Sequence, residues 1–291
     1  MKPQNTFAHK FFSERLAVIG TVWIFLWVII ALAGPLLRPD PTPHANNQFL
    51  EFSLLPPGSS VEKPNGAEFT YHLGSDRYGR DFLSRLMAGS AISLSVAGVA
   101  VLISLVIGLF LGALAGYKGG KIDMIVSWFL QVVWTVPTLL MVIAITIAFG
   151  KGFWQVFVAI GLTMWVEVAR IVRGQFISMR ELEFVQAAQA LGLSDAKIMF
   201  KHMLPNAIGP IIVVAAANFA AAILIESGLS FLGVGAQIPV PSWGNIIKEH
   251  YHLLTSDLAW LAIIPGALIA SLVLAFTWLG DGLRVAFEVN K

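Results

Sequence analysis

Six long apolar stretches, uncharged except for Glu167 in one of them, constrain this chain more than any other feature of its sequence. About 20 apolar residues in a helix cross the roughly 30 Å hydrocarbon core of a bilayer. The stretches are solidly apolar, whereas the strands of a transmembrane β-barrel alternate with period two. The chain is therefore predicted to be an all-α membrane protein, a bundle of six transmembrane helices. The predicted spans are residues 16–37, 86–117, 124–150, 152–169, 202–225 and 258–280.

Composition agrees with this prediction and excludes several other classes of protein. Of the 291 residues, 57% are hydrophobic and only 12% are charged, against roughly 25% charged residues in a soluble domain. The chain has no cysteine, which excludes disulfides and thiolate metal sites. A net charge of +2 gives no reason to expect a nucleic-acid partner.

The basic residues divide unevenly between the two sides of such a bundle. Because six spans return the chain to the side on which it started, both termini lie on one side. That side carries 12 of the 19 Lys and Arg residues, and cytoplasmic loops hold the excess of basic residues. Both termini are therefore predicted to be cytoplasmic. The first span, 16–37, is longer than the roughly 7–15 apolar residues of a signal peptide, so we expect it to be retained.

The segments on the other side are predicted to be largely irregular. Segment 38–85 is rich in Pro and Asn and is expected to form an external lobe. Segment 227–247 is uncharged, but its Gly and Pro content predicts a loop rather than a span. His250 and His252, beside Glu249, form a metal-like cluster, but two histidines with one residue between them are weak evidence for a metal site. We interpret them instead as part of an external polar loop.

The cytoplasmic segment before the fifth span is different in character. Residues 181–191 are good helix formers, and Gly192 is typical of a helix C-cap. Ser194 and Asp195 can cap a second short helix, which we expect to end before Pro205. The sequence thus predicts an ordered helix–turn–helix on the cytoplasmic face, since a plain connection between spans needs far fewer ordered residues.

Three polar or helix-breaking residues lie in or directly beside the predicted spans. Pro137 removes a backbone hydrogen bond, and we expect a static kink there rather than a hinge. A carboxylate at a helix centre costs about 2.5–3.5 kcal/mol, so it should face protein or water. Glu167 is expected to form a local ion pair with Arg170 or Arg173. Glu226 is expected to reach the outer interface. All three remain candidates for a gate or a substrate path.

Small residues recur at four-residue spacing on two of the predicted helices. Gly108, Gly112 and Gly116 form one smooth face, and Ala216 and Ala220 form another. Such faces let a second helix approach closely. We interpret both as packing surfaces rather than as surfaces that slide during gating.

Catalytic motifs are absent from the sequence. Gly119, Gly120 and Lys121 lack the following Ser or Thr of a phosphate-binding loop. The chain is therefore not expected to bind ATP, a metal or another cofactor itself. If it works against a gradient, the energy comes from an ion gradient or from a partner.

The cytoplasmic helix–turn–helix resembles the "EAA" motif of the permease subunits of ATP-binding-cassette importers. The motif has the form E-A-A, three residues, G, nine residues, I-x-L-P, and this chain departs from it at Gln186 and His202. The resemblance implies an ATPase-coupling role for Gln186, Ala187, Ala188, Gly192, Asp195, Leu204 and Pro205.

Three further segments are similar to the oligopeptide/dipeptide permeases of the "C" type. Residues 72–81 resemble their L-G-T-D-x-x-G-R-D signature. Residues 226–233 followed by 241–244 resemble the exit of their fifth span, and 280–284 resemble their C-terminal signature. We interpret residues 72–81 as an external elbow rather than as a contact for a binding protein.

This resemblance implies a type I ABC importer permease fold with a cytoplasmic coupling helix, in a prokaryotic inner membrane. Its implied partners are a second homologous permease, two ATPases that carry ATP and Mg, an external substrate-binding protein and membrane lipid. The implied cargo is a peptide, with nickel chelates or antimicrobial peptides as alternatives. The implied divisions of the chain are 1–15 (cytoplasmic segment), 16–37 (first span), 38–85 (external lobe), 86–284 (permease core, with coupling segment 180–205) and 285–291 (cytoplasmic tail).

A self-sufficient secondary transporter, coupled through Glu167 or Glu226, is the alternative from a different class. It predicts inverted repeats and charges near the bilayer midplane. No repeat is visible in the sequence, and this alternative leaves the cytoplasmic helix–turn–helix without a purpose.

Overall fold

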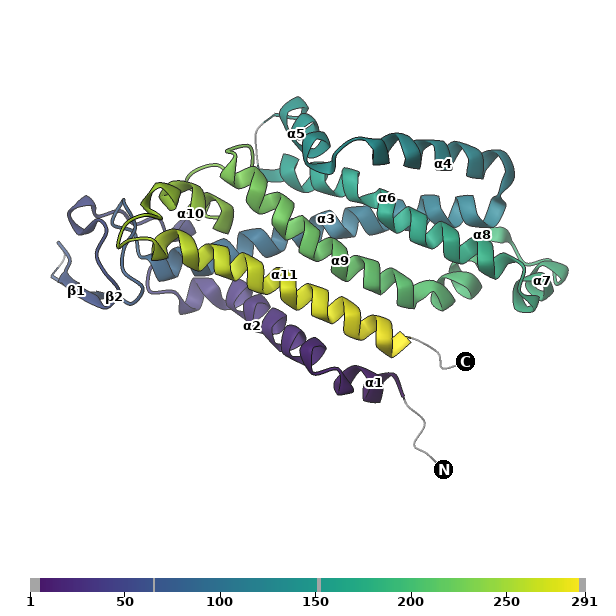
Figure 1. Ribbon diagram of the computed structural model, residues 1–291, viewed down its shortest axis with the longest axis horizontal. Coiled ribbons are helices and arrows are strands. Elements are labelled where there is room, and N and C mark those ends of the chain that lie inside the picture. Colours follow the sequence, from purple (N-terminus) through teal and green to yellow (C-terminus); the bar gives the residue numbers. More distant parts are fainter. Residues whose placement is uncertain (1–5, 65, 151–152, 288–291) are drawn as a thin grey trace.

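The structure, a computed structural model, describes residues 6–64, 66–150 and 153–287. It is a bundle of long helices with a small lobe at one end (Figure 1). The α-helices are α1 (Phe7–Ser13), α2 (Arg15–Leu37), α3 (Phe82–Lys118), α4 (Gly120–Thr135), α5 (Thr138–Ala148), α6 (Phe153–Arg180), α7 (Glu183–Ala190), α8 (Asp195–Lys197), α9 (Leu204–Phe231), α10 (Trp243–His250) and α11 (Trp260–Phe287). The shorter elements are η1 (Pro43–Ala45), η2 (Leu50–Phe52), the π-helical η3 (Ile198–Met203), η4 (Tyr251–Leu253) and the antiparallel strands β1 (Ser59–Glu62) and β2 (Glu68–Tyr71).

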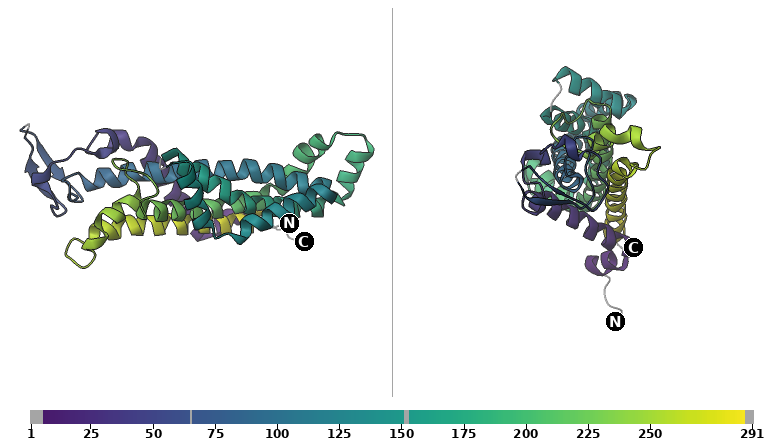
Figure 2. Two further views of the ribbon diagram at one scale, coloured as in Figure 1. Left: turned by 90° about the horizontal axis from the view of Figure 1, so that it is seen from above. Right: turned by 90° about the vertical axis from the view of Figure 1, so that its left-hand side faces the viewer.

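The bundle has two distinct ends. The strands β1 and β2 lie at one end, beside α10, and we call this the lobe end (Figure 1). Helices α1 and α7 and the last turn of α11 lie at the other, which we call the hairpin end. The view from above shows how elongated the molecule is between them (Figure 2). At the hairpin end the rings of Phe7 and Phe287 lie 4.8 Å apart, so the first and last described helices meet there.

The predicted six-span bundle is confirmed. Within the described residues, five continuous helices are long and apolar enough to cross a membrane: Arg15–Leu37, Phe82–Lys118, Trp154–Arg180, Asp195–Phe231 and Trp260–Phe287. The pair α4 and α5 passes the same test together and is the sixth when it is counted as one broken span, bent by 94° at its break. Pro137 lies at that break and precedes α5, where its missing N–H breaks no helical hydrogen bond.

Several helices extend beyond the predicted spans. Helix α3 begins at Phe82 rather than at 86, because the side chain of Asp81 caps it by accepting from the amide of Ser84. Helix α6 continues to Arg180 instead of ending at 169, and α11 runs to Phe287, into the predicted tail.

The prediction that a second short helix ends before Pro205 is wrong. The helix runs from Asp195 through the π-helical η3 into α9 and ends at Phe231. Pro205 directly follows the π-helical turn η3, where the amide of Leu204 reaches back to the carbonyl of Met199. The wider π-helical turn carries the continuous helix past the proline.

The predicted loop 227–247 is also partly helical. Helix α9 continues to Phe231, and α10 begins at Trp243. The hydroxyl of Ser242 caps α10 by accepting from the amide of Asn245 at 3.2 Å. The indole of Trp243 is fully buried and donates to the carbonyl of Leu86 at 3.0 Å, so α10 packs firmly on α3.

The glycine face of α3 packs directly on α6, as predicted. A Cβ atom added at Gly112 would lie 2.6 Å from the carbonyl oxygen of Ala169, and one at Gly108 would lie 2.5 Å from Cβ of Val168. Both helices run from the lobe end to the hairpin end. Their backbones therefore approach as closely as glycine allows.

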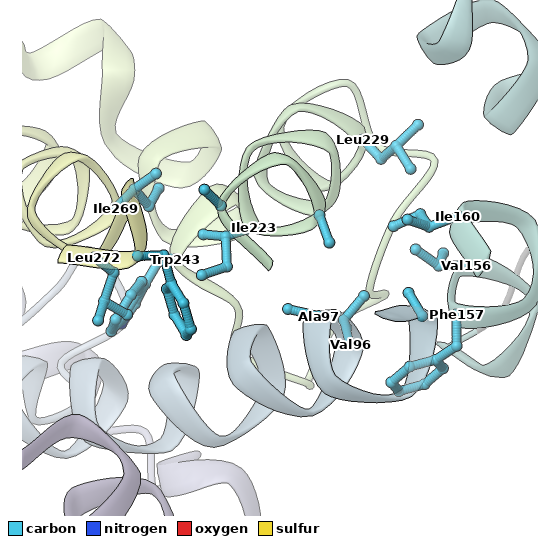
Figure 3. Close-up of a cluster of buried hydrophobic side chains, with 14 of the residues drawn as sticks. Val96, Ala97, Val156, Phe157, Ile160, Ile223, Leu229, Trp243, Ile269 and Leu272 are labelled. Atoms are coloured by element: carbon cyan, nitrogen blue, oxygen red, sulfur yellow. The ribbon is translucent and has the colours of Figure 1, made fainter. Parts of the chain in front are cut away.

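The largest buried apolar cluster joins five helices toward the lobe end. Figure 3 shows side chains of α3, α6, α9, α10 and α11 converging there. The labelled members are Val96, Ala97, Val156, Phe157, Ile160, Ile223, Leu229, Trp243, Ile269 and Leu272.

We predict that Gly112→Ala lowers the stability of the bundle by about 1–3 kcal/mol, because the added methyl group meets backbone rather than a movable side chain. Thermal unfolding in detergent measures the effect. Gly98→Ala is the matched control on the same helix, since its Cβ would make only an ordinary contact with Phe219 at 3.9 Å. Equal stability of the two variants would contradict the close packing of α3 on α6.

Candidate functional site

The segment 180–205 contains a helical hairpin at the hairpin end of the molecule (Figure 1). Helix α7 lies within the predicted 181–191 stretch and ends where Gly192 adopts a φ of +71°. The amide of Leu193 then donates to the carbonyl of Ala188 at 3.2 Å, which satisfies the end of α7. A left-handed residue is needed at this turn, so glycine is the favoured residue there.

Three polar contacts tie this hairpin to the end of α3. Asp195 accepts a hydrogen bond from the hydroxyl of Tyr117 at 2.9 Å, and its second oxygen pairs with Lys118. Gln189 donates to the same Tyr117 oxygen at 3.3 Å. Asp195 was predicted as part of the coupling segment, but its partner Tyr117, which lies 78 residues earlier in the chain, was not.

The two alanines of the motif lie on different faces of α7. Ala188 is buried with Val185 against Ile198, Met199 and Met203, so it holds the hairpin together. Ala187 is exposed, as is Gln186, whose side-chain amide donates to the carbonyl of Glu181. Leu204 is partly buried in the same cluster and Pro205 is exposed.

An apolar surface that the sequence analysis missed surrounds Ala187. Phe184 is 40% exposed and Leu191 is 80% exposed. These residues and Ala187 are spaced at i, i+3 and i+7, which places them on one face of a helix. We call Phe184, Ala187 and Leu191 the tip face. The helical spacing of these residues can be recognised in the sequence. The motif includes Ala187 but not Phe184 or Leu191, so the tip face was not predicted.

At the lobe end, the predicted elbow forms around Asp76. One oxygen of this carboxylate accepts from the amides of Tyr78 at 2.8 Å and Arg80 at 3.0 Å. The other oxygen lies 2.5 Å from Nε of Arg80. Of the other charged residues in the elbow, Asp81 caps α3 and Arg77 stacks on the ring of Tyr78. The elbow is therefore held by one internal ion pair and a cap.

A partner from α10 completes this ion pair. Nη2 of Arg80 lies 2.5 Å from Oε2 of Glu249, and Arg85 lies 4.0 Å from the same oxygen. The Arg80, Asp76 and Glu249 side chains are at most 7% exposed. This buried network joins the lobe to α10, and the sequence analysis placed Glu249 wrongly in a polar loop.

His250 is likewise buried rather than part of a polar loop. Its Nδ1 lies 2.8 Å from the carbonyl of Ile246, and burial lowers the pKa of the ring, which keeps it neutral. Asp76, Glu249 and His250 bring ligand atoms within 4.8 Å of one another. The guanidinium of Arg80 already lies 2.5 Å from both carboxylates, so it takes the place that a cation would fill.

Glu226 lies inside the bundle and does not reach the outer interface, contrary to prediction. It is 1% exposed and accepts from the hydroxyls of Ser93 at 3.0 Å and Ser230 at 2.7 Å. Ser230 in turn accepts from the amide of Ala236. The carboxyl group thereby joins α9 to α3 and to the loop that follows α9.

Glu167 lies at the edge of a hollow of about 300 Å³ beside Pro137. The α4–α5 bend, α6 and α9 line this hollow, with Trp134 and Ile225 among the walls. The predicted ion pair of Glu167 with a neighbouring arginine is wrong. Arg173 forms a bidentate pair with Asp123, and the guanidinium of Arg170 lies 3.8 Å above the ring of Trp134.

Two family models match this chain. Residues 108–287 match the model described as binding-protein-dependent transport system inner membrane component. Residues 5–57 match the N-terminal transmembrane domain of oligopeptide transport permease C.

The chain is also similar to named permeases over nearly its whole length. It is 35% identical over 276 residues to the dipeptide transport system permease protein DppC of Alkalihalophilus pseudofirmus, covering 95% of this chain and 86% of that protein. It is 33% identical over 279 residues to the oligopeptide transport system permease protein OppC of Bacillus subtilis, covering 96% and 87%.

A solved structure shares the fold. An inward-facing conformation of the MetNI methionine ABC transporter superposes with a TM-score of 0.59 at 19% identity, covering 71% of this chain and 98% of that one. At this level of identity the likeness concerns the fold alone. The predicted type I importer fold is thus confirmed.

We predict that Arg80→Ala destabilises the lobe end by about 3–5 kcal/mol, because it leaves two buried carboxylates without their partner. Limited proteolysis between residues 38 and 81, together with thermal unfolding, measures the loss. Arg77→Ala is the control in the same elbow, since Arg77 is exposed and its hydrogen bond and its ring contact are both with Tyr78. Equal protease resistance of both variants would show that the network does not hold the lobe.

Proposed function

Because the chain belongs to the family of binding-protein-dependent transport system inner membrane components, we propose that it is the permease subunit of an ATP-driven importer of peptides. The α7–α8 hairpin is the observation that carries this proposal. It is ordered, presents an exposed tip face, and is fixed to the transmembrane helices at both of its ends. A transporter driven by an ion gradient has no use for such an element.

The proposed partners follow from what this chain lacks. It has no phosphate-binding loop, so two ATPase subunits would bind ATP and Mg and hydrolyse the nucleotide. A second permease would complete the path through the membrane, and an external binding protein would deliver the peptide. The termini and the hairpin would face the cytoplasm, where basic residues predominate.

The hairpin offers a direct mechanical route from the ATPases to the spans. We place the tip face, Phe184, Ala187 and Leu191, in a groove of one ATPase. A movement of that groove would pass through Asp195 to the end of α3 and through the uninterrupted helix Asp195–Phe231 to the lobe end. Closure of the two ATPases would thus rock the helices and alternate access to the path.

Peptides are the proposed cargo because the chain is similar to dipeptide and oligopeptide permeases. Nickel chelates and antimicrobial peptides are the alternatives within the same type of importer. An ion-coupled secondary transporter is the alternative from another class.

Co-purification tests the assembly. The tagged chain is expressed with its genomic neighbours, extracted in mild detergent, and its partners are identified by mass spectrometry. A second six-span permease and P-loop ATPases are the expected partners, and peptides presented by the binding protein should then stimulate ATP hydrolysis. A well-folded homo-oligomer without an ATPase would instead support a gradient-driven transporter.

We predict that Ala187→Glu lowers ATP-dependent peptide uptake by about tenfold or more, which corresponds to roughly 1.4 kcal/mol or more of lost coupling. The added charge lies on the exposed tip face, so the fold is expected to be unchanged. Uptake into vesicles is measured at equal protein levels, with Ser60→Glu, an exposed site on β1, as the matched added charge. Normal uptake by Ala187→Glu would remove the tip face from the coupling contact.

A further inference from the structure

Glu167 is a carboxylate in a membrane-spanning helix for which the described residues supply no counter-ion. On α3, Gly108 packs against Val168, the neighbour of Glu167. Glu167 lies halfway along α6, 14 residues after Phe153 and 13 before Arg180, inside the apolar span Trp154–Arg180. The carboxylate is therefore carried by the middle of a membrane-spanning helix.

A charged group at this depth cannot face lipid at low cost. The penalty at a helix centre is about 2.5–3.5 kcal/mol on insertion scales, so such groups face protein or a water-filled space. Glu167 is exposed on the surface of this chain, and among residues 6–64, 66–150 and 153–287 it forms no ion pair. Its side of α6 must therefore border a second protein or an aqueous path.

The basic residues closest in sequence are already engaged. Arg173 makes two hydrogen bonds to Asp123, at 2.5 and 2.8 Å. Arg170 stacks on Trp134, with its guanidinium carbon 3.8 Å from the ring centroid. Neither arginine is paired with Glu167, so the carboxylate of Glu167 is available to bind an incoming cation.

The hollow beside Glu167 has a suitable shape and chemistry for one end of a peptide. Its walls are largely apolar, from Val133, Met164 and Ile225, with the hydroxyl-bearing Thr138 and Thr163 among them. The hydroxyl of Thr163 donates to the carbonyl of Ile160 in its own helix. Within the lining of the hollow, Glu167 is the one charged side chain.

We infer that Glu167 binds the free α-ammonium group of the peptide during its passage through the membrane. The α-amino group of a peptide has a pKa of about 8 and is protonated at neutral pH. It is present on every linear peptide whatever its side chains, and its three donors suit a carboxylate. This inference rests on the proposed function, because it names the part of the peptide that the path recognises.

Uptake of matched peptides tests the inference in the complete importer, reconstituted in vesicles with one binding protein. A tripeptide with a free amino terminus is compared with its N-acetylated form. The binding protein is the same throughout, so its own preference cancels when the ratio of the two uptake rates is compared between permease variants. Glu167→Gln is expected to reduce the ratio of free to acetylated uptake by about tenfold, whereas Glu167→Asp retains most of it. Glu68→Gln, an exposed site on β2, is the charge-loss control.

A second measurement reads contact directly and does not depend on uptake of the acetylated peptide. A water-soluble carbodiimide joins a carboxylate to a primary amine as an amide and takes up the released water as a urea. Added during turnover, it should attach the free-amine peptide to Glu167, as found by mass spectrometry of the digested permease. The acetylated peptide and the Glu167→Gln variant should give no such product.

Other outcomes would overturn the inference. Equal loss of uptake for both peptides in Glu167→Gln would assign the carboxylate to a contact with the second permease. An unchanged ratio, or the absence of an adduct at Glu167 while other carboxylates react, would remove it from the path. Failure of the proposed function would look different, since the wild-type importer would then take up no peptide with ATP.

Discussion

The backbone contact between α3 and α6 is the constraint on which the rest of the structure depends. Gly112 meets the carbonyl of Ala169 without a side chain between them, and the same face extends from Gly108 to Gly116. The two helices form one rigid rod along the bundle. Helix α3 follows the elbow with its buried ion pairs at the lobe end. At the hairpin end, α3 finishes at Lys118, the partner of Asp195. Both functional ends are therefore positioned by the same pair of helices.

The sequence predicted the spans well because charged residues cannot be placed cheaply in lipid. It predicted α10 poorly, since glycine and proline on both sides of Trp243 are typical of a loop. The burial of Trp243 against α3 overrides those local signals. The same reason explains Glu249, whose charge predicts exposure until its partner Arg80, 169 residues away, is known. It also explains His250, which the same helix buries.

The hairpin shows which part of a site can be derived from a motif. Turn chemistry is local, so Gly192 and the helix before it were predictable from their neighbours alone. The separate roles of Ala187 and Ala188 depend on what packs behind α7, which is a cluster from η3 and α9.

The partner of Glu167 was predicted wrongly from local sequence. An ion pair with a close neighbour was the natural expectation, but Asp123, far away in the sequence, is the partner of Arg173.

The buried network at the lobe end also imposes an order on biosynthesis. Arg80 and Asp76 emerge from the ribosome long before Glu249, and at about 5–20 residues per second the delay is roughly ten to thirty seconds. During that interval the elbow has the internal ion pair between Arg80 and Asp76 but lacks the contact with Glu249 of α10. The lobe end is completed only after the segment between α9 and α11 has been synthesised. A chain truncated before that segment would display an unfinished lobe, in which Arg80 lacks its partner Glu249 on α10.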